Sequence, residues 1–139
     1  MGAAEAILTG FPSAPYVLVV EGSPYERDAL VVFLEDAGYE SVGAQNGEVA
    51  LAYLRAPCPP MLMVLDMVLP VLDGWQLLAL RKQDAALSAI SVVVLSACVF
   101  TEGLEGVSAC LRKPVNGEEL VSTIEDLTGR RRKRPSQAP

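Results

Sequence analysis

Three short, nearly continuous runs of apolar residues form the framework of the predicted fold. They cover residues 16–20, 61–65 and 91–95. Apolar runs of this length, rich in valine and leucine, are typical of strands that are buried on both faces of a parallel sheet. Two weaker strands are predicted over residues 41–45 and 109–112. The pattern therefore predicts five strands along the chain.

Segments with helical spacing lie between these strands. Ser23 is predicted to be the N-cap of the first helix, with Pro24 at the first helical position and Glu26 completing a capping box. Gly38 fits the end of this helix. Its apolar stripe has the spacing of one helix face and consists of Leu30, Phe33, Leu34 and Ala37. Further helices are predicted after Asn46, Asp73 and Asn116.

The alternation of apolar strands and amphipathic helices predicts an α/β fold. Its sheet would be open, parallel and doubly wound, with helices on both faces. Only sixteen residues separate Ser96 from Lys113, and they must hold a loop, a helix, a second loop and the last strand. We therefore expect the fourth helix to be shortened or irregular, and residues 97–108 to be the most irregular part of the fold.

The chain is predicted to hold a single domain. Residues 1–15 contain prolines and small residues without a period, and we interpret them as a loose N-terminal extension. Residues 16–129 form the predicted domain. Residues 130–139 begin with five adjacent cations and have no apolar anchor, which predicts a basic disordered tail.

Composition removes several classes of function. The 139 residues are 51% hydrophobic and include no histidine, which excludes Ser-His-Asp catalysis, Cys-His catalysis and imidazole metal sites. The three cysteines, Cys58, Cys98 and Cys110, are odd in number and show no C-x-x-C spacing. They favour a reducing compartment, so we expect a cytoplasmic protein. Cys98 and Cys110 are expected to be small apolar core residues.

The net charge of −6 is unevenly distributed. Five of the eleven basic residues lie at 130–134, so the six that remain in residues 1–129 face seventeen acidic residues, a net charge of −11. A folded domain with this charge should repel nucleic acid. The longest apolar stretch is interrupted by Asp66 and Pro70, so no membrane span is predicted. No glycine-rich phosphate-binding motif is present, so no nucleotide cofactor is predicted.

Four residues with chemical potential directly follow or close an apolar strand. They are Glu21, Asp66, Ser96 and Lys113. Ligands of doubly wound sheets bind at the carboxyl ends of the strands, where these side chains would converge. Carboxylates bind hard divalent cations, and a carboxylate can act as a nucleophile that forms an acyl phosphate. A neighbouring cation and lysine would neutralise the charge on a transferring phosphoryl group.

Four stretches of the sequence resemble the receiver domain of two-component response regulators. They are LVVE at 18–21, VLDMVLPVLDG at 64–74, VVLSA at 93–97 and LRKP at 111–114. The resemblance covers roughly residues 15–128 and implies a flavodoxin-like five-stranded sheet with the order 2-1-3-4-5. It implies a signalling module that only receives a phosphoryl group and is not an enzyme in the ordinary sense.

The resemblance also implies roles for individual residues. Asp66 would accept a phosphoryl group from a histidine kinase or a phosphotransfer protein, and Ser96 and Lys113 would contact that group. Mg²⁺ would lie between Asp66, Glu21 and the backbone carbonyl of Val68. Lys113–Pro114 would be a cis peptide bond. The output would pass to an unknown downstream protein, as expected for a stand-alone receiver.

Two departures from the family pattern leave a second interpretation open. The family usually has two adjacent acids after the first strand, whereas this chain has Glu21 followed by Gly22. Cys110 occupies the position of the usual aromatic switch residue. The missing acid predicts weak Mg²⁺ binding. The alternative function is a pseudo-receiver that acts as a phosphorylation-independent protein-interaction module.

Overall fold

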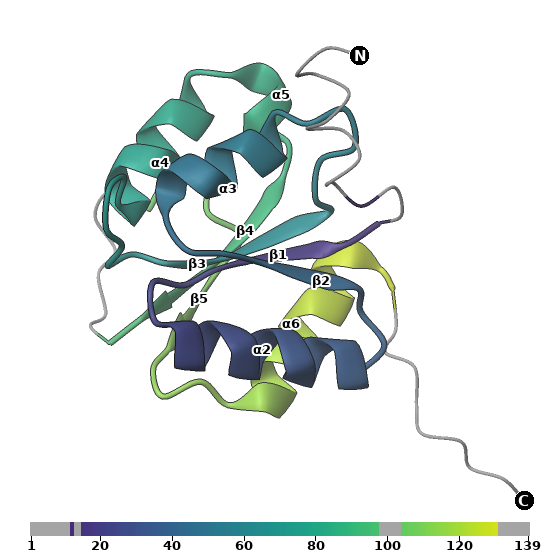
Figure 1. Ribbon diagram of the computed structural model, residues 1–139. Coiled ribbons are helices and arrows are strands. Elements are labelled where there is room, and N and C mark those ends of the chain that lie inside the picture. The colour runs from purple at the N-terminus through teal and green to yellow at the C-terminus, as the bar shows by residue number, and fades with distance from the viewer. Residues whose placement is uncertain (1–11, 13–14, 98–103, 131–139) are drawn as a thin grey trace, which may run out of the picture.

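The computed structural model describes residues 12, 15–97 and 104–130. Within these residues, five strands form one parallel sheet (Figure 1) with the order β2-β1-β3-β4-β5. The predicted sheet and its strand order are therefore confirmed. The strands are β1 (Val17–Val20), β2 (Ser41–Ala44), β3 (Leu62–Asp66), β4 (Ser91–Ser96) and β5 (Ala109–Arg112).

Helices cover both faces of the sheet, as Figure 1 shows. α2 and α6 lie on one face, and α3, α4 and the short α5 lie on the other. The helices are α2 (Pro24–Asp36), α3 (Gly47–Leu54), α4 (Gly74–Lys82), α5 (Ala85–Ser88) and α6 (Gly117–Thr128). None of the helices in the described part of the chain is long and apolar enough to cross a membrane.

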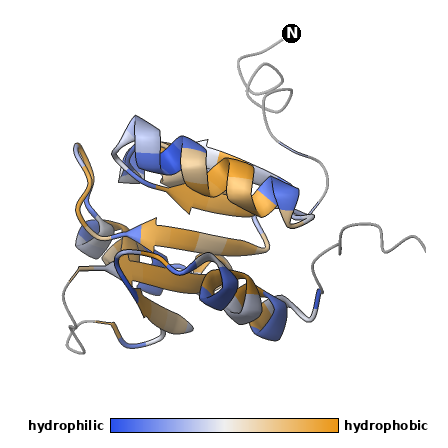
Figure 2. Cartoon of the chain, turned by 90° about the horizontal axis from the view of Figure 1, so that it is seen from below, coloured by the Kyte–Doolittle hydropathy of each residue, from blue (hydrophilic) through white to orange (hydrophobic). Residues whose placement is uncertain are grey.

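The sheet separates two hydrophobic cores because its side chains alternate between the faces. Leu18 and Val20 of β1 pack with the α3, α4 and α5 side, whereas Val17 and Val19 pack with α2 and α6. All four are at most 1% exposed. The orange strands between partly blue helices in Figure 2 show the same arrangement. Burial on both faces explains why the central strands read as continuous apolar runs.

Most of the predicted helix caps are present. The Ser23 hydroxyl accepts a hydrogen bond from the Glu26 N–H at 3.3 Å, and the Asn46 side chain accepts one from Val49 at 2.8 Å. Asp73 and Gln76 form a complete capping box. The predicted capping box of the first helix is wrong, because the Glu26 carboxylate binds Lys113 instead.

Two residues that the sequence placed in the core are exposed. Phe33 is 36% exposed, because it lies at the side of α2, where its ring packs over Gly117. Cys110 is exposed as well. β5 is an edge strand, and Leu111 takes the inward position of its alternating pattern, so its neighbour Cys110 faces outward. Cys98 lies outside the described residues.

The connection between β4 and β5 contains no helix in its described parts, residue 97 and residues 104–108. The expectation of a shortened fourth helix otherwise falls on residues 98–103, which lie outside the described residues. The buried Arg81 of α4 donates hydrogen bonds to the carbonyls of Ser88 at 3.0 Å, Ile90 at 2.8 Å and Gly106 at 3.4 Å. This guanidinium therefore ties α4 to the segment that leads into β5.

Val71 has a strained backbone in the loop between β3 and α4. Its φ is 66°, in the left-handed region that β-branched residues avoid. The Leu72 N–H donates to the Pro70 carbonyl at 2.7 Å across this residue, which closes a tight three-residue turn. The side chain is 72% exposed. Burial of the valine methyl groups therefore does little to offset the strain.

We expect Val71→Asn to stabilise the protein by about 1 kcal/mol, because asparagine tolerates the left-handed region. The measurement is urea unfolding of the variant and the wild type. Val68→Asn is the matched control, since Val68 lies in the same loop, is 83% exposed and has no positive φ. An equal effect of the two substitutions would contradict the strain argument.

Candidate functional site

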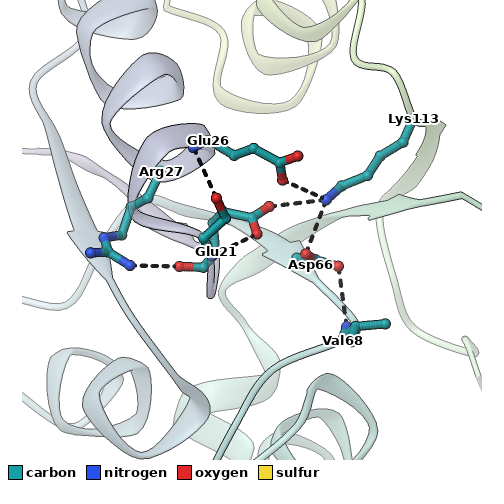
Figure 3. A network of polar contacts seen from close by, with 7 residues as sticks. Glu21, Glu26, Arg27, Asp66, Val68 and Lys113 are labelled. Carbon is teal, nitrogen blue, oxygen red and sulfur yellow. Dashed lines mark hydrogen bonds and ion pairs between the residues drawn. The ribbon is translucent and has the colours of Figure 1, made fainter.

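Three of the sequence-predicted residues meet at one edge of the sheet. Asp66 is the last residue of β3, Glu21 directly follows β1, and Lys113 directly follows β5. All three strands run in parallel, so their carboxyl ends lie at the same edge. In Figure 3 the two carboxylates and the ammonium point toward one another.

The Lys113 ammonium is the centre of this cluster. Its Nζ lies 3.0 Å from Glu21 Oε2, 3.0 Å from Asp66 Oδ2 and 3.2 Å from Glu26 Oε2. The side chains of Glu21 and Asp66 are only 4% and 11% exposed. Two nearly buried carboxylates therefore share one counter-charge, and the more exposed Glu26 adds a third.

Backbone groups orient the two buried carboxylates. Asp66 Oδ1 accepts a hydrogen bond from the Val68 N–H at 3.1 Å, and Glu21 Oε1 accepts one from the Ser23 N–H at 3.2 Å. Arg27 Nη1 donates to the Glu21 carbonyl at 2.9 Å. Each carboxylate thus receives one backbone hydrogen bond and one from Lys113, which fixes its direction at the end of its strand.

Burial and charge shift the titration of this cluster. Burial raises the pKa of the Glu21 carboxyl above its ordinary value of 4.5, and the hydrogen bonds from Lys113 and the Ser23 N–H oppose that rise. Burial of the Lys113 ammonium opposes its charged form. The hydrogen bonds to Asp66 and Glu21 outweigh burial, so the pKa of Lys113 lies above its ordinary value of 10.5.

The remaining predicted residues lie at the same edge. Ser96 ends β4, one residue beyond Leu95, which is the register partner of Asp66. Its carbonyl accepts a hydrogen bond from the Lys113 N–H at 2.9 Å. The Lys113–Pro114 peptide bond is cis, as the resemblance implied. The Val68 carbonyl lies 3.8 Å from the position that a Cβ on Gly22 would take.

Gly22 departs from the family pattern because it has no carboxylate, and not because its backbone conformation requires glycine. Its φ lies outside the left-handed region, so the conformation does not require glycine. A Cβ at this position would lie 3.2 Å from Pro70 Cδ and 3.8 Å from the Val68 carbonyl oxygen. The site therefore lacks a carboxylate at a place that accepts a side chain only if Pro70 shifts by a few tenths of an ångström.

Glu26 belongs to the site although the sequence did not predict it. Its position three residues after Ser23 indicated a capping box, and that interpretation assigned its carboxylate to the helix end. The structure places Glu26 on the first turn of α2, which starts three residues after Glu21, beside the ends of β1 and β3. The short distance along the chain between the end of β1 and this first turn was the feature of the sequence that indicated a place for Glu26 near the site.

The carboxylates form a set that can hold a metal ion. One oxygen from each of Glu21, Glu26 and Asp66 lies within 4.8 Å of the others. Beside them, a cleft of about 480 Å³ is lined by Glu21, Tyr25, Glu26, Ala29, Leu30, Lys113, Pro114 and Val115. This edge of the sheet thus joins a hard-oxygen ligand set and an ammonium to an open, largely apolar cleft.

Known proteins with similar sequences include a response regulator and several transcriptional regulatory proteins. Protein PilH of Pseudomonas aeruginosa is 33% identical over 117 residues, which cover 78% of this chain and 93% of that relative. Response regulator Rre1 of Synechocystis is 33% identical over 120 residues, 82% of this chain and 52% of Rre1. The chain spans about half the length of Rre1 and of several other curated relatives.

Solved structures agree with the sequence comparison. The receiver domain of Francisella response regulator 1452 has a TM-score of 0.73 and 31% identity, and the match covers 84% of this chain and 98% of that one. A signal receiver domain of a histidine kinase from Syntrophus aciditrophicus has a TM-score of 0.74 and 28% identity, with 84% and 91% covered. The family model of the response regulator receiver domain matches residues 17–125. The chain therefore belongs to the family of response regulator receiver domains.

Proposed function

We propose that this receiver accepts a phosphoryl group on Asp66 and signals through contacts with a downstream protein. The observation that carries the proposal is the placement of the Asp66 carboxylate, 3.0 Å from the Lys113 ammonium, at the carboxyl edge of a receiver sheet. A carboxylate in this place already faces a group that can bind phosphoryl oxygens.

The proposed step is a transfer from a phosphohistidine. A carboxylate oxygen of Asp66 attacks phosphorus, the P–N bond to the donor imidazole breaks, and a P–O bond forms. The imidazole leaves with the bonding electron pair and takes up a proton. The Lys113 ammonium would then contact the negatively charged phosphoryl group on Asp66, and the Ser96 hydroxyl would donate a hydrogen bond to a phosphoryl oxygen. The chain itself supplies no histidine, so the donor is a separate group.

The residues present fit the divalent cation that the family implies. Carboxylate and carbonyl oxygens are the ligands that Mg²⁺ prefers. Asp66, Glu21 and the Val68 carbonyl would hold it, and the acidic set in this structure has the required close spacing. When bound, the ion neutralises charge on the phosphoryl group. This role explains why acidic residues gather around a position that must also receive an anion.

The proposed partners follow from this chemistry. The donor would be a histidine kinase or a phosphotransfer protein, which must bring its phosphohistidine to Asp66. The receiver would act as a stand-alone protein in the cytoplasm. Its folded domain would not bind nucleic acid, because its acidic residues far outnumber its basic ones.

The test is phosphorylation by a small donor such as phosphoramidate, followed by intact mass measurement. We expect the wild type to gain one phosphoryl mass in the presence of Mg²⁺, and Asp66→Asn to gain none. Asp28→Asn is the control, because Asp28 is an exposed acid on α2. A wild type that gains no mass at saturating donor and Mg²⁺ would contradict the proposal.

A pseudo-receiver is the second candidate function. It is favoured by Gly22, which removes a carboxylate from the site, and by the exposed thiol of Cys110 where the family usually has an aromatic residue. In that case the domain binds its partner without phosphate. The same mass measurement separates the two functions, because only the first requires a phosphoryl group on Asp66.

A further inference from the structure

We propose that Glu26 replaces the acid that the family usually has at position 22, and supplies the third carboxylate of the site. The inference rests on the proposed function, because it concerns the cation that assists phosphorylation. A receiver with two acids after the first strand has three carboxylates and one lysine around the acceptor. Here Glu21, Glu26, Asp66 and Lys113 restore the same count and the same formal charge of −2.

The geometry of α2 brings Glu26 to the site. The helix begins at Pro24, so its first turn lies beside the end of β1 and directs the Glu26 side chain toward Lys113 (Figure 3). The Glu26 carboxylate lies 3.2 Å from Lys113 Nζ and within 4.8 Å of the nearest oxygens of Glu21 and Asp66. It therefore lies within the reach that a shared cation requires.

Glu26 also takes no part in the capping box that its position in the helix predicts. In a capping box its carboxylate would accept a hydrogen bond from the Ser23 N–H. That N–H donates to Glu21 Oε1 instead. The Ser23 hydroxyl still caps the helix through the Glu26 N–H. The carboxylate of Glu26 can thus move without loss of the cap.

The exposure of the Glu26 side chain determines how strongly it can bind the cation in place of an acid at position 22. The side chain of Glu26 is 54% exposed, whereas that of Glu21 is 4% exposed. A solvated carboxylate on a flexible stem loses conformational entropy when it is held, so it binds a cation less firmly than a rigid acid next to the strand. Glu26 accordingly makes the site competent for Mg²⁺, with lower affinity than an acid at position 22 would give.

Calorimetric titration with Mg²⁺ tests this inference. We expect Glu26→Gln to weaken Mg²⁺ binding about tenfold, the lower end of the range for loss of a supporting ligand group. Glu35→Gln is the matched control, since it makes the same chemical change on the last turns of the same helix, at an exposed position. An unchanged affinity in Glu26→Gln, equal to that of the control, would overturn the inference.

A double-mutant cycle with Gly22→Asp gives a second readout. If Glu26 substitutes for the acid at position 22, Glu26→Gln should have an effect of less than about twofold once Asp is present there, because the two changes are coupled. Equal effects in both backgrounds would overturn the inference. If the Gly22→Asp variant does not fold, the Mg²⁺ affinity of Glu26→Asp is measured instead. Because its side chain is one methylene shorter, Glu26→Asp should lose most of the Mg²⁺ affinity that Glu26→Gln loses. Full Mg²⁺ affinity in Glu26→Asp would count against the inference.

Failure of this inference and failure of the proposed function give different results. A wild type that gains a phosphoryl mass with Mg²⁺, while Glu26→Gln binds the ion as well as the control does, overturns only the role of Glu26. A wild type that neither binds Mg²⁺ nor gains the mass overturns both.

Discussion

Replacement of Lys113 by methionine is expected to destabilise the protein by about 2 kcal/mol at pH 7 and to slow phosphorylation of Asp66 about 100-fold. Lys113 is the only cation with a nitrogen within 4 Å of the Glu21 and Asp66 carboxylate oxygens among the described residues. Its loss leaves two nearly buried carboxylates without a counter-charge. Because the lysine side chain is 23% exposed, water screens part of the effect, so we place it below that of a fully buried pair.

The pH dependence of this loss has a definite sign. Without Lys113, the pKa of Glu21 should rise further above its ordinary value of 4.5, because burial and Asp66 both disfavour its charge. A carboxyl with a raised pKa binds more protons in the folded state, so stability falls as pH rises from the ordinary value through the raised one. The stability difference between variant and wild type should therefore shrink as the pH is lowered toward about 5.

Urea unfolding between pH 5 and pH 8, together with phosphorylation rates by mass measurement, checks these expectations. Arg112→Met is the control, because it removes a positive charge from the preceding residue, whose side chain is exposed. It should change stability by less than about 0.5 kcal/mol. A Lys113→Met variant that matches this control in stability at pH 7 would show that the carboxylates do not depend on the ammonium.

The sheet and most of the site could be predicted because they depend on local pattern. A strand that is buried on both faces requires an apolar run, and the residue after that run lies at the carboxyl edge of the sheet. Glu21, Asp66 and Lys113 were predicted on this ground, and in the structure each of the two carboxylates lies 3.0 Å from the Lys113 ammonium. Ser96 follows from the same rule, because β4 pairs with β3 in register.

Glu26 was missed for a physical reason. A residue at the third position of a helix can serve the cap or reach a neighbouring strand end, and the sequence does not show which contact has the better geometry. The Ser23 N–H is taken by Glu21, a residue that belongs to β1 rather than to the helix. The choice therefore depends on how α2 lies against the sheet, which is a tertiary property.

The errors at Phe33 and Cys110 share a cause. Periodicity shows which face of an element is apolar, but it does not show how wide the covered strip is or whether a strand is at an edge. α2 buries only Leu34 completely, so Phe33 lies outside the strip. The burial of Arg81 was not predicted either, because its guanidinium depends on three carbonyls, at the end of α5, just before β4 and in the segment before β5. No local sequence pattern predicts such a contact between segments that are distant along the chain.

Gly74→Ala is expected to destabilise the protein by about 3 kcal/mol, the upper end of the range for overpacking in a well-packed site. A Cβ on Gly74 would lie 2.7 Å from Met67 Cα and 3.2 Å from the Asp66 carbonyl oxygen. Both of these atoms belong to the backbone, so no side-chain rotation relieves the contact. The Gly74 N–H also donates to the Met67 carbonyl at 3.1 Å, which ties the start of α4 to the end of β3.

The same clash should slow phosphorylation, because the backbone that must move carries Asp66. A displacement of about 1 Å at a reacting group lowers rates about 100-fold, so we expect a loss between about tenfold and 100-fold. Gly117→Ala is a close control. Gly117 is also the first residue of its helix, so both variants gain the same intrinsic helix propensity.

At Gly117 the added methyl group meets the ring of Phe33, which is a partly exposed side chain that can rotate toward solvent. We therefore expect Gly117→Ala to lose less than about 1 kcal/mol and to keep the wild-type phosphorylation rate. Urea unfolding and the mass assay measure both quantities on the same samples. Equal stability losses in the two variants would show that the backbone between Asp66 and Gly74 yields as easily as an exposed ring. In that case the close approach of α4 to β3 does not fix the position of the acceptor.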